Sequence, residues 1–278
     1  MPERPVLRLP CAKVLFLFAL MTMSATAGAT EISREGRQIR DADQQKERAL
    51  TVLYGRSFLD GGREDWDDFD LELVARLNPN LIVMVGSNAR RREGETDVMY
   101  RTSLAYFPNK TLELHWGLAL TPGADFSARQ KHNIGLEWRG NSRVSVGLDL
   151  ERLNYDAGPV DQVTPGVIFW LSEDDRTFFN AAWTFGHAFH DRYFDAQNLK
   201  LVFGLSGNRS LRFGYYHGEQ PEEDPSVPGT LLLNSDIVSA YYHVPIREKI
   251  ELIMGVEYED LRDVYDRTTA TFGVTSRF

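Results

Sequence analysis

The sequence from residue 50 onward is a succession of segments, each about ten residues long, in which apolar and polar residues alternate. In TLELHWGLAL (residues 111–120), every second residue from Leu112 onward is leucine or tryptophan, and the residues between them are polar or small. The same alternation recurs in HNIGLEWRG (132–140), RVSVGLDLE (143–151) and EKIELIMGVEYED (248–260). Because successive side chains of a strand point to opposite faces, this period of two predicts β-strands rather than helices.

The breaks between these segments predict how the strands are connected. One class of break is short and has the composition of tight turns, as in NPN (78–80), GNS (140–142) and GNR (207–209). The other class is longer, as in EQPEEDPSVPG (219–229), and the two classes alternate along the chain. Six short turns and seven long loops predict fourteen antiparallel strands in an up-and-down meander, with twelve or sixteen strands as the alternatives.

Strands of this length, with short turns at one rim and longer loops at the other, are typical of transmembrane β-barrels. A soluble β-sandwich or propeller is the alternative fold class. Aromatic residues near the strand ends favour the membrane barrel, because such residues form girdles at the two membrane interfaces. The predicted girdle residues are Trp66, Tyr106, Phe107, Trp138, Trp170, Phe178, Tyr193, Phe194 and Tyr258.

Residues 1–27 are predicted to form a signal peptide. Basic residues precede the apolar run VLFLFALMTM (14–23), which is too short to span a bilayer, and Ala25-Thr26-Ala27 fits the cleavage pattern. Cys11 is the only cysteine and would leave with this segment, so we expect no disulfide in the mature chain. Residues 28–49 are predicted to be a short polar periplasmic lead-in, and residues 50–278 to be the barrel.

The final segment, TTATFGVTSRF (268–278), fits a destination in the outer membrane. An open strand edge in lipid would leave backbone groups unpaired, so we expect this last strand to close on the first. Phe278, Val274 and Phe272 share the apolar parity, and we interpret them as a signal for the barrel-assembly machinery. Ser276 departs from the aromatic or aliphatic residue that usually stands two places before the final Phe.

The stretch LYGRSFLDGGREDWDDFDLELVAR (53–76), followed by hairpins and the closing VTSRF, resembles the YaiO-type family of outer-membrane barrels. The resemblance covers residues 50–278. It implies an outer-membrane protein that accompanies polysaccharide-handling systems, and it implies no catalytic residues. The helical repeats that precede the barrel in some related proteins have no counterpart in the short lead-in.

Parity assigns one set of charged strand residues to the lumen. Their signs are mixed, so we expect them to pair across a narrow lumen, because an unpaired charge away from bulk water is costly. Glycines of the same parity, such as Gly117 and Gly135, are expected to leave room for passage, with strand curvature as the alternative explanation. The predicted lumen-lining residues are Glu113, His115, Lys131, Glu137, Arg139, Asp149, Glu151, Lys200, Arg212, Glu251 and Glu257.

The histidines are the candidates for catalysis or metal binding. Parity places only His115 in the lumen, beside Glu113, and we interpret it as part of a polar network. HAFHDRYF (187–194) is the best local cluster, but an interfacial loop with an aromatic anchor is the simpler interpretation. The sequence contains no G-x-S-x-G, H-E-x-x-H or phosphate-binding glycine loop. We therefore expect no catalytic residue, no metal and no cofactor.

Together these features predict an outer-membrane β-barrel that is a narrow pore or a surface component associated with envelope or exopolysaccharide handling. The alternatives are a non-conducting structural or surface-interaction barrel, and a hydrolase or acyltransferase active at the rim. The expected partners are outer-membrane lipid and lipopolysaccharide, the barrel-assembly machinery and polysaccharide. A net charge of −9 argues against nucleic acid. The loop 219–233 is a candidate plug, because its TLLLN could fold inward.

Overall fold

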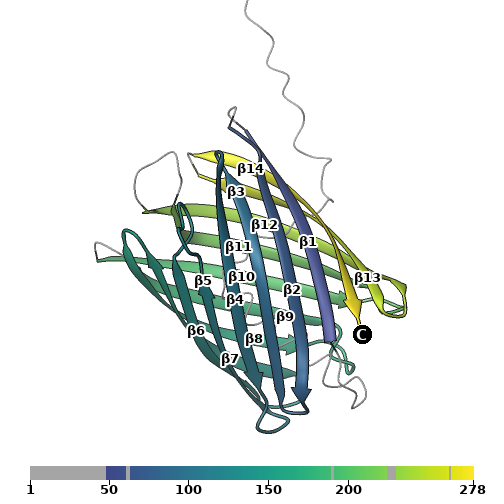
Figure 1. Cartoon of the computed structure of the whole chain (residues 1–278). Helices are drawn as coiled ribbons and strands as arrows, with labels where there is room; N and C mark the ends of the chain where they lie inside the picture. Colours follow the sequence, from purple (N-terminus) through teal and green to yellow (C-terminus); the bar gives the residue numbers. More distant parts are fainter. Residues whose placement is uncertain (1–47, 61–62, 189–190, 224–229, 263) are drawn as a thin grey trace, which may run out of the picture.

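The computed structural model is a closed barrel of fourteen antiparallel strands (Figure 1). It describes residues 48–60, 63–188, 191–223, 230–262 and 264–278. Each strand pairs with the next one along the chain and the last pairs with the first, so the predicted meander, strand number and closure are confirmed. The strands are β1 (Arg48–Leu59), β2 (Trp66–Asn78), β3 (Leu81–Arg92), β4 (Glu95–Tyr106), β5 (Leu112–Leu120), β6 (Gln130–Arg139), β7 (Val144–Tyr155), β8 (Gly158–Trp170), β9 (Phe178–Ala188), β10 (Arg192–Gly204), β11 (Ser210–Glu223), β12 (Thr230–Arg247), β13 (Ile250–Leu261) and β14 (Tyr265–Arg277).

The predicted signal peptide and nearly all of the predicted lead-in lie outside the described residues, and the first strand begins at Arg48. β1 and β14 run side by side from one end of the barrel to the other (Figure 1). At their lower ends the backbone N–H of Arg48 donates to the Phe278 carbonyl at 3.1 Å, and the Phe278 N–H donates to the Arg48 carbonyl at 2.9 Å. The seam is therefore hydrogen-bonded as far as the final residue.

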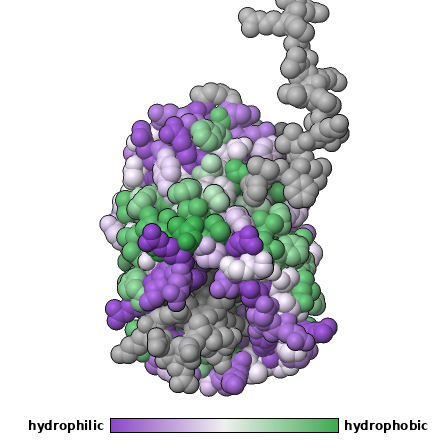
Figure 2. Space-filling model, turned by 90° about the vertical axis from the view of Figure 1, so that its right-hand side faces the viewer, coloured by the Kyte–Doolittle hydropathy of each residue, from purple (hydrophilic) through white to green (hydrophobic). Residues whose placement is uncertain are grey.

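The polarity of the wall is the reverse of that of a soluble barrel. On β14, Thr269, Thr271 and Thr275 are buried in the interior, whereas Phe272 and Val274 are exposed on the outside. β5 repeats this pattern, and Figure 2 shows a hydrophobic band across the middle of one face with hydrophilic residues above and below it. A lipid-facing apolar exterior and a polar interior are the arrangement of transmembrane barrels. The described part of the chain has no helix with the length and apolarity that a membrane crossing requires.

The predicted aromatic girdle is only partly correct. Tyr106, Trp138, Tyr193 and Tyr258 are exposed on the outer surface, as expected. The other five members are buried inside the barrel, with exposed fractions of 6 % or less. They face inward because their strand parity is that of the polar lumen, although they lie near strand ends. Inside, they belong to apolar clusters that narrow the two ends of the lumen: Trp66, Phe107, Trp170, Phe178 and Phe194.

The predicted contrast between short turns and long loops is also weaker than expected. We call the end that holds Arg48 and Phe278 the turn end and the opposite end the loop end. Two connections at the loop end are tight, Glu93-Gly94 and Asp156-Ala157, whereas the connection from β8 to β9 at the turn end covers residues 171–177. Glu93 and Gly94 both have positive φ, 48° and 85°, as two-residue hairpin turns require. Gly158 begins β8, and His187 lies near the end of β9, so both residues belong to strands and not to loops.

Candidate functional site

The candidate site is the lumen, and its middle is lined by ion pairs. On β2 and β4, Arg101 donates to Asp70 through both terminal nitrogens, at 2.8 and 2.7 Å, and to Glu72 at 2.9 Å. These two carboxylates neutralise one guanidinium that is largely shielded from solvent, in the bidentate geometry that favours arginine–carboxylate pairs. Two carboxylates against one guanidinium leave this group with a formal charge of −1.

A second polar group lies on β5, β6 and β7. His115 is hydrogen-bonded to Asp149 across Gly135 of the intervening strand, and its other ring nitrogen lies 3.8 Å from Glu113. Glu137 stands directly opposite Glu113 in the β5–β6 ladder, and both are buried. The structure thus places four of the predicted lumen-lining residues, Glu113, His115, Glu137 and Asp149, on one continuous inner surface.

The third group joins β12, β13 and β14. His243 Nδ1 and Glu251 lie 2.7 Å apart, and Arg277 donates to the same carboxylate at 3.1 Å. His243 is 7 % exposed and faces the lumen, so the expectation that His115 is the only lumenal histidine is wrong. Tyr241, two residues before His243 on the same strand, is also buried and faces inward, so the alternation places both side chains in the lumen.

An arginine–aromatic stack lies inside the loop end. The guanidinium carbon of Arg92 is 4.2 Å from the centre of the Trp66 ring, and that of Arg267 is 5.2 Å from it. Tyr265 contacts Trp66 edge-on, with ring centroids 5.5 Å apart. Arg267 in turn pairs with Glu259 at 2.5 Å, so charge and aromatic surface are interleaved here. Arginine stacks well on aromatic faces. This stack covers the inner side of the wall at β2 and β14.

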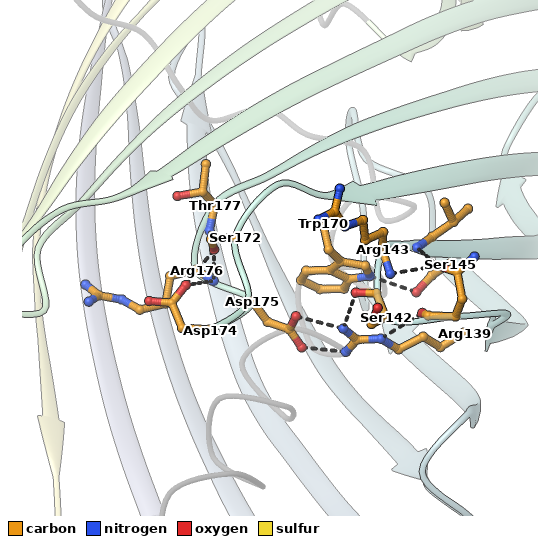
Figure 3. A network of polar contacts seen from close by, with 12 residues as sticks. Arg139, Ser142, Arg143, Ser145, Trp170, Ser172, Asp174, Asp175, Arg176 and Thr177 are labelled. Carbon is orange, nitrogen blue, oxygen red and sulfur yellow. Dashed lines mark hydrogen bonds and ion pairs between the residues drawn. The ribbon is translucent and has the colours of Figure 1, made fainter.

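A network of polar contacts lies at the turn end (Figure 3). Asp175, in the connection from β8 to β9, accepts two hydrogen bonds from Arg139 of β6, at 2.5 and 2.7 Å. The Arg139 guanidinium lies 4.9 Å from the ring centre of Trp170, whose indole N–H donates to Ser145 at 3.0 Å. These hydrogen bonds hold the connection against the end of β6.

The same connection holds a capped carboxylate. The Ser172 hydroxyl donates to Asp174 at 2.5 Å, and the backbone N–H of Arg176 donates to it at 3.2 Å (Figure 3). The hydrogen bond from Ser172 lowers the pKa of Asp174 below its ordinary value, because it stabilises the ionised form. This turn is thus held in one conformation by its own side chains.

The hairpin of β11 and β12 covers the loop end. We call its described outer part, residues 219–223 and 230–234, the mouth hairpin. Leu232 is buried against residues of β7, β8, β9 and β10, and Leu233 packs against the Trp66 and Tyr265 cluster on the opposite wall. The Tyr155 hydroxyl of β7 donates to the Pro221 carbonyl at 3.4 Å, and Gln220 donates to Glu259 of β13 at 2.9 Å. Contacts to both walls mean that the hairpin crosses the mouth.

The bend that turns this hairpin inward lies at Gly218. Its φ is 142°, a region that side chains rarely adopt, and a Cβ there would lie 2.4 Å from the Cα of Ala196. Glycine is therefore required for β11 to lean over the lumen while it stays paired with β10. As far as the described residues extend, the loop 219–233 lies inward over the lumen.

The lumenal glycines do not leave open space in the way expected. A Cβ on Gly135 would lie 2.2 Å from His115, one on Gly117 would lie 2.1 Å from Asn133, and one on Gly255 would lie 2.4 Å from Tyr241. Each glycine thus receives the side chain of a neighbouring strand, which lies flat on the wall. The neighbouring side chain fills the place of the missing Cβ, so any free space lies closer to the barrel axis than the glycine.

The remaining predicted residues are placed as follows. Lys200 and Glu257 are buried in the interior, and Arg212 is half-buried there. Phe278, Phe272 and Val274 are exposed on the outside, with 56, 54 and 36 % of their surfaces accessible. Of the cluster 187–194, His187 faces outward, 3.4 Å from Asp191, and residues 189–190 lie outside the described part. Within the described ranges, no group of three or more His, Cys, Asp or Glu side chains is placed to hold a metal ion.

No protein-family model and no curated protein matches the sequence. Solved structures of outer-membrane barrels do match its fold. The CymD monoaromatic hydrocarbon channel superposes with a TM-score of 0.63 at 10 % identity, over 90 % of this chain and 93 % of that one. A FadL homologue of Pseudomonas aeruginosa gives 0.55 at 11 % identity, over 86 % and 91 % of the two chains. A bacterial polysaccharide outer membrane secretin gives 0.51 at 12 % identity, over 83 % and 98 %.

The chain has the fold of an outer-membrane β-barrel. Identities near 10 % show likeness of fold alone, so the solutes of these neighbours are not transferred to this barrel. We therefore infer the function of this barrel from the residues that line its lumen and from the mouth hairpin that covers it.

Proposed function

We propose that this protein is a narrow outer-membrane channel for hydrophilic solutes, closed at rest by the mouth hairpin. The observation that carries the proposal is the reversed polarity of the wall, with Thr269, Thr271 and Thr275 inside and Phe272 outside. Hydroxyl groups and neutralised ion pairs offer hydrogen bonds to a solute in water. A polar interior of this kind holds a water-filled path in porins, unless a segment of the chain plugs it.

We also propose that the solutes are saccharides of the cell envelope. The support is chemical: the middle of the lumen presents hydroxyl, amide and paired charged groups in place of apolar surface. The link to polysaccharide handling implied by the YaiO-type resemblance belongs to this proposal, as does the placement of the loop end at the cell surface. The apolar clusters at the two ends act as constrictions on either side of the polar middle.

Single-channel conductance in a planar bilayer tests the proposal. The informative variant replaces residues 220–233 with Asn-Gly, because Glu219 and Asn234 are directly paired and a two-residue turn can join them. We expect small or rare conductance steps from the native chain and larger, steady steps from the variant. Insertion without conductance in both proteins would favour the structural or surface-interaction alternative.

A further inference from the structure

Two oppositely charged side chains of the lumen attract each other but, in the described part of the chain, are not joined by a hydrogen bond or a close ion pair. Lys131 on β6 and Glu151 on β7 face the lumen as diagonal neighbours, since Lys131 pairs with Leu153 and Glu151 with Asn133. Among the described residues, neither side chain forms a hydrogen bond or an ion pair, and both carboxylate oxygens of Glu151 are buried without a partner. Glu151 is 4 % exposed. The charged groups described above, by contrast, are held in short contacts.

An uncommitted buried carboxylate is costly, because it loses its hydration without gaining hydrogen bonds. Lys131 is only half-buried and retains access to solvent inside the lumen. The nearby guanidinium groups of Arg90 and Arg101 are already paired with carboxylates on β2, so they do not compete for Glu151. The geometry points to a site whose hydrogen bonds are completed by a solute.

The neighbours of Glu151 define the chemistry of that solute. The residues directly opposite it are both amides, Asn133 on β6 and Gln162 on β8. Farther along β8, Thr164 shares a hydrogen bond with Thr184 of β9, with the two hydroxyls 2.9 Å apart. The surface thus combines one ammonium donor, one carboxylate acceptor and several neutral groups that both donate and accept.

We infer that Lys131, Glu151 and Gln162 form a binding site for a neutral polyhydroxylated solute, such as an oligosaccharide, on the inner wall of β6 to β8. Adjacent hydroxyl groups donate to the carboxylate and accept from the ammonium, so one solute satisfies both. An anion would be attracted by Lys131 but repelled by Glu151, and a cation the reverse, so the pair as a whole favours neither sign of charge. This inference rests on the proposed function, because it names the site at which a passing solute is held.

Equilibrium binding tests the site without requiring conductance. Maltotriose is titrated into the detergent-solubilised protein by calorimetry, using both the native chain and the variant with residues 220–233 replaced, so that access through the mouth does not limit binding. The test variants are Glu151→Gln, Lys131→Met and Gln162→Leu. Glu173→Gln, on the exposed connection from β8 to β9, is the matched control. The heat-dependent mobility of each variant in gels verifies that the barrel has folded.

We expect maltotriose binding that is weakened about tenfold or more by Glu151→Gln and by Lys131→Met, since each change removes a hydrogen bond to a charged group. Glu173→Gln should bind as the native chain does. Maltotriose binding that is absent, or equal in all folded variants, would overturn the site. Binding of glycine in place of maltotriose at the same residues would overturn the assignment to saccharides. A silent bilayer with residue-dependent maltotriose binding would refute the channel and retain the site.

Discussion

Gly218 and Ala196 are packed so closely across the β10–β11 ladder that a Cβ on Gly218 would lie 2.4 Å from the Ala196 Cα. Together with the positive φ of Gly218, this contact fixes the direction of the mouth hairpin. Gly218→Val should cost about 1–3 kcal/mol in the free energy of unfolding, because it forces a branched residue into a strained backbone region. It should also raise the conductance, since the hairpin can no longer lie across the mouth.

Urea unfolding and bilayer recordings measure the two effects. Gly94→Asn is the control: Gly94 also has positive φ, but no atom lies within 4 Å of its virtual Cβ, and asparagine tolerates this region. A Gly218→Val barrel with native stability and native conductance would show that the bend does not hold the hairpin.

Pro165 interrupts the hydrogen-bond ladder between β8 and β9. The register runs through this region, but the pairs of Thr164 and Pro165 with β9 are missing, while Leu148 of β7 still pairs with Pro165. Proline has no N–H to donate, so Pro165→Thr should add one ladder bond worth about 1 kcal/mol. Part of this gain is offset by the greater freedom of the unfolded chain.

Hydrogen exchange is the sharper measurement for this variant. The new amide at position 165 and its neighbours on β9 should exchange more slowly than β9 amides in the native chain. Pro159→Thr, near the start of the same strand, should leave β9 unchanged. Equal exchange across β9 in the native chain and in Pro165→Thr would contradict the assignment of the gap to the missing donor.

The turn that carries Asp174 should depend on pH in a defined direction. Because the folded-state pKa of Asp174 lies below its ordinary value of 3.8, its ionised form stabilises the fold at neutral pH. That contribution is fully present above the unfolded pKa and is lost as pH falls through the folded pKa. Ser172→Ala removes the main cause and should raise the Asp174 pKa toward 3.8.

Carbon-detected NMR titration of the aspartate carboxyl groups measures this shift. Ser206→Ala, on the next connection at the same end, is the control and should leave the Asp174 titration unchanged. An Asp174 titration that is identical in the native chain and in Ser172→Ala would contradict the role of the hydroxyl.

Phe278 is predicted to matter for assembly more than for stability. Its side chain is 56 % exposed on the outer surface, so Phe278→Ala removes little packing. We expect a clear fall in the amount of barrel recovered from outer membranes of expressing cells, with refolding into detergent almost unchanged. Ile246→Ala is the control, because Ile246 is equally exposed, at 58 %, near the same end. Equal recovery of both variants would remove the assembly role.

The sequence predicts the wall of this barrel well and its two mouths poorly. Alternation in segments such as TLELHWGLAL is a local signal, and closure on fourteen strands follows from the number of breaks. Parity also gives the side to which residues such as Glu113 and Glu151 point. The partners of the charged side chains could not be predicted from alternation: Arg139 and Asp175, for example, meet only because the connection from β8 to β9 lies against the end of β6.

The aromatic residues show the limit most clearly. Trp66 and Phe194 stand at strand ends, like the residues of a membrane girdle, yet they fill the lumen ends because parity and not position along the strand sets the side they face. The bend at Gly218 is equally hidden in the sequence, where it is one glycine among 22. Its φ of 142° together with its contact with the Ala196 backbone distinguishes it.

His115 and Asp149 both lie against Gly135, so the position of these two lumen side chains depends on the Cβ that this glycine lacks. A single methyl group at Gly135 would lift both side chains toward the axis, and one at Gly255 would do the same to Tyr241. The aperture can therefore be graded by one-carbon changes in the wall, with the chemistry of the lining left intact.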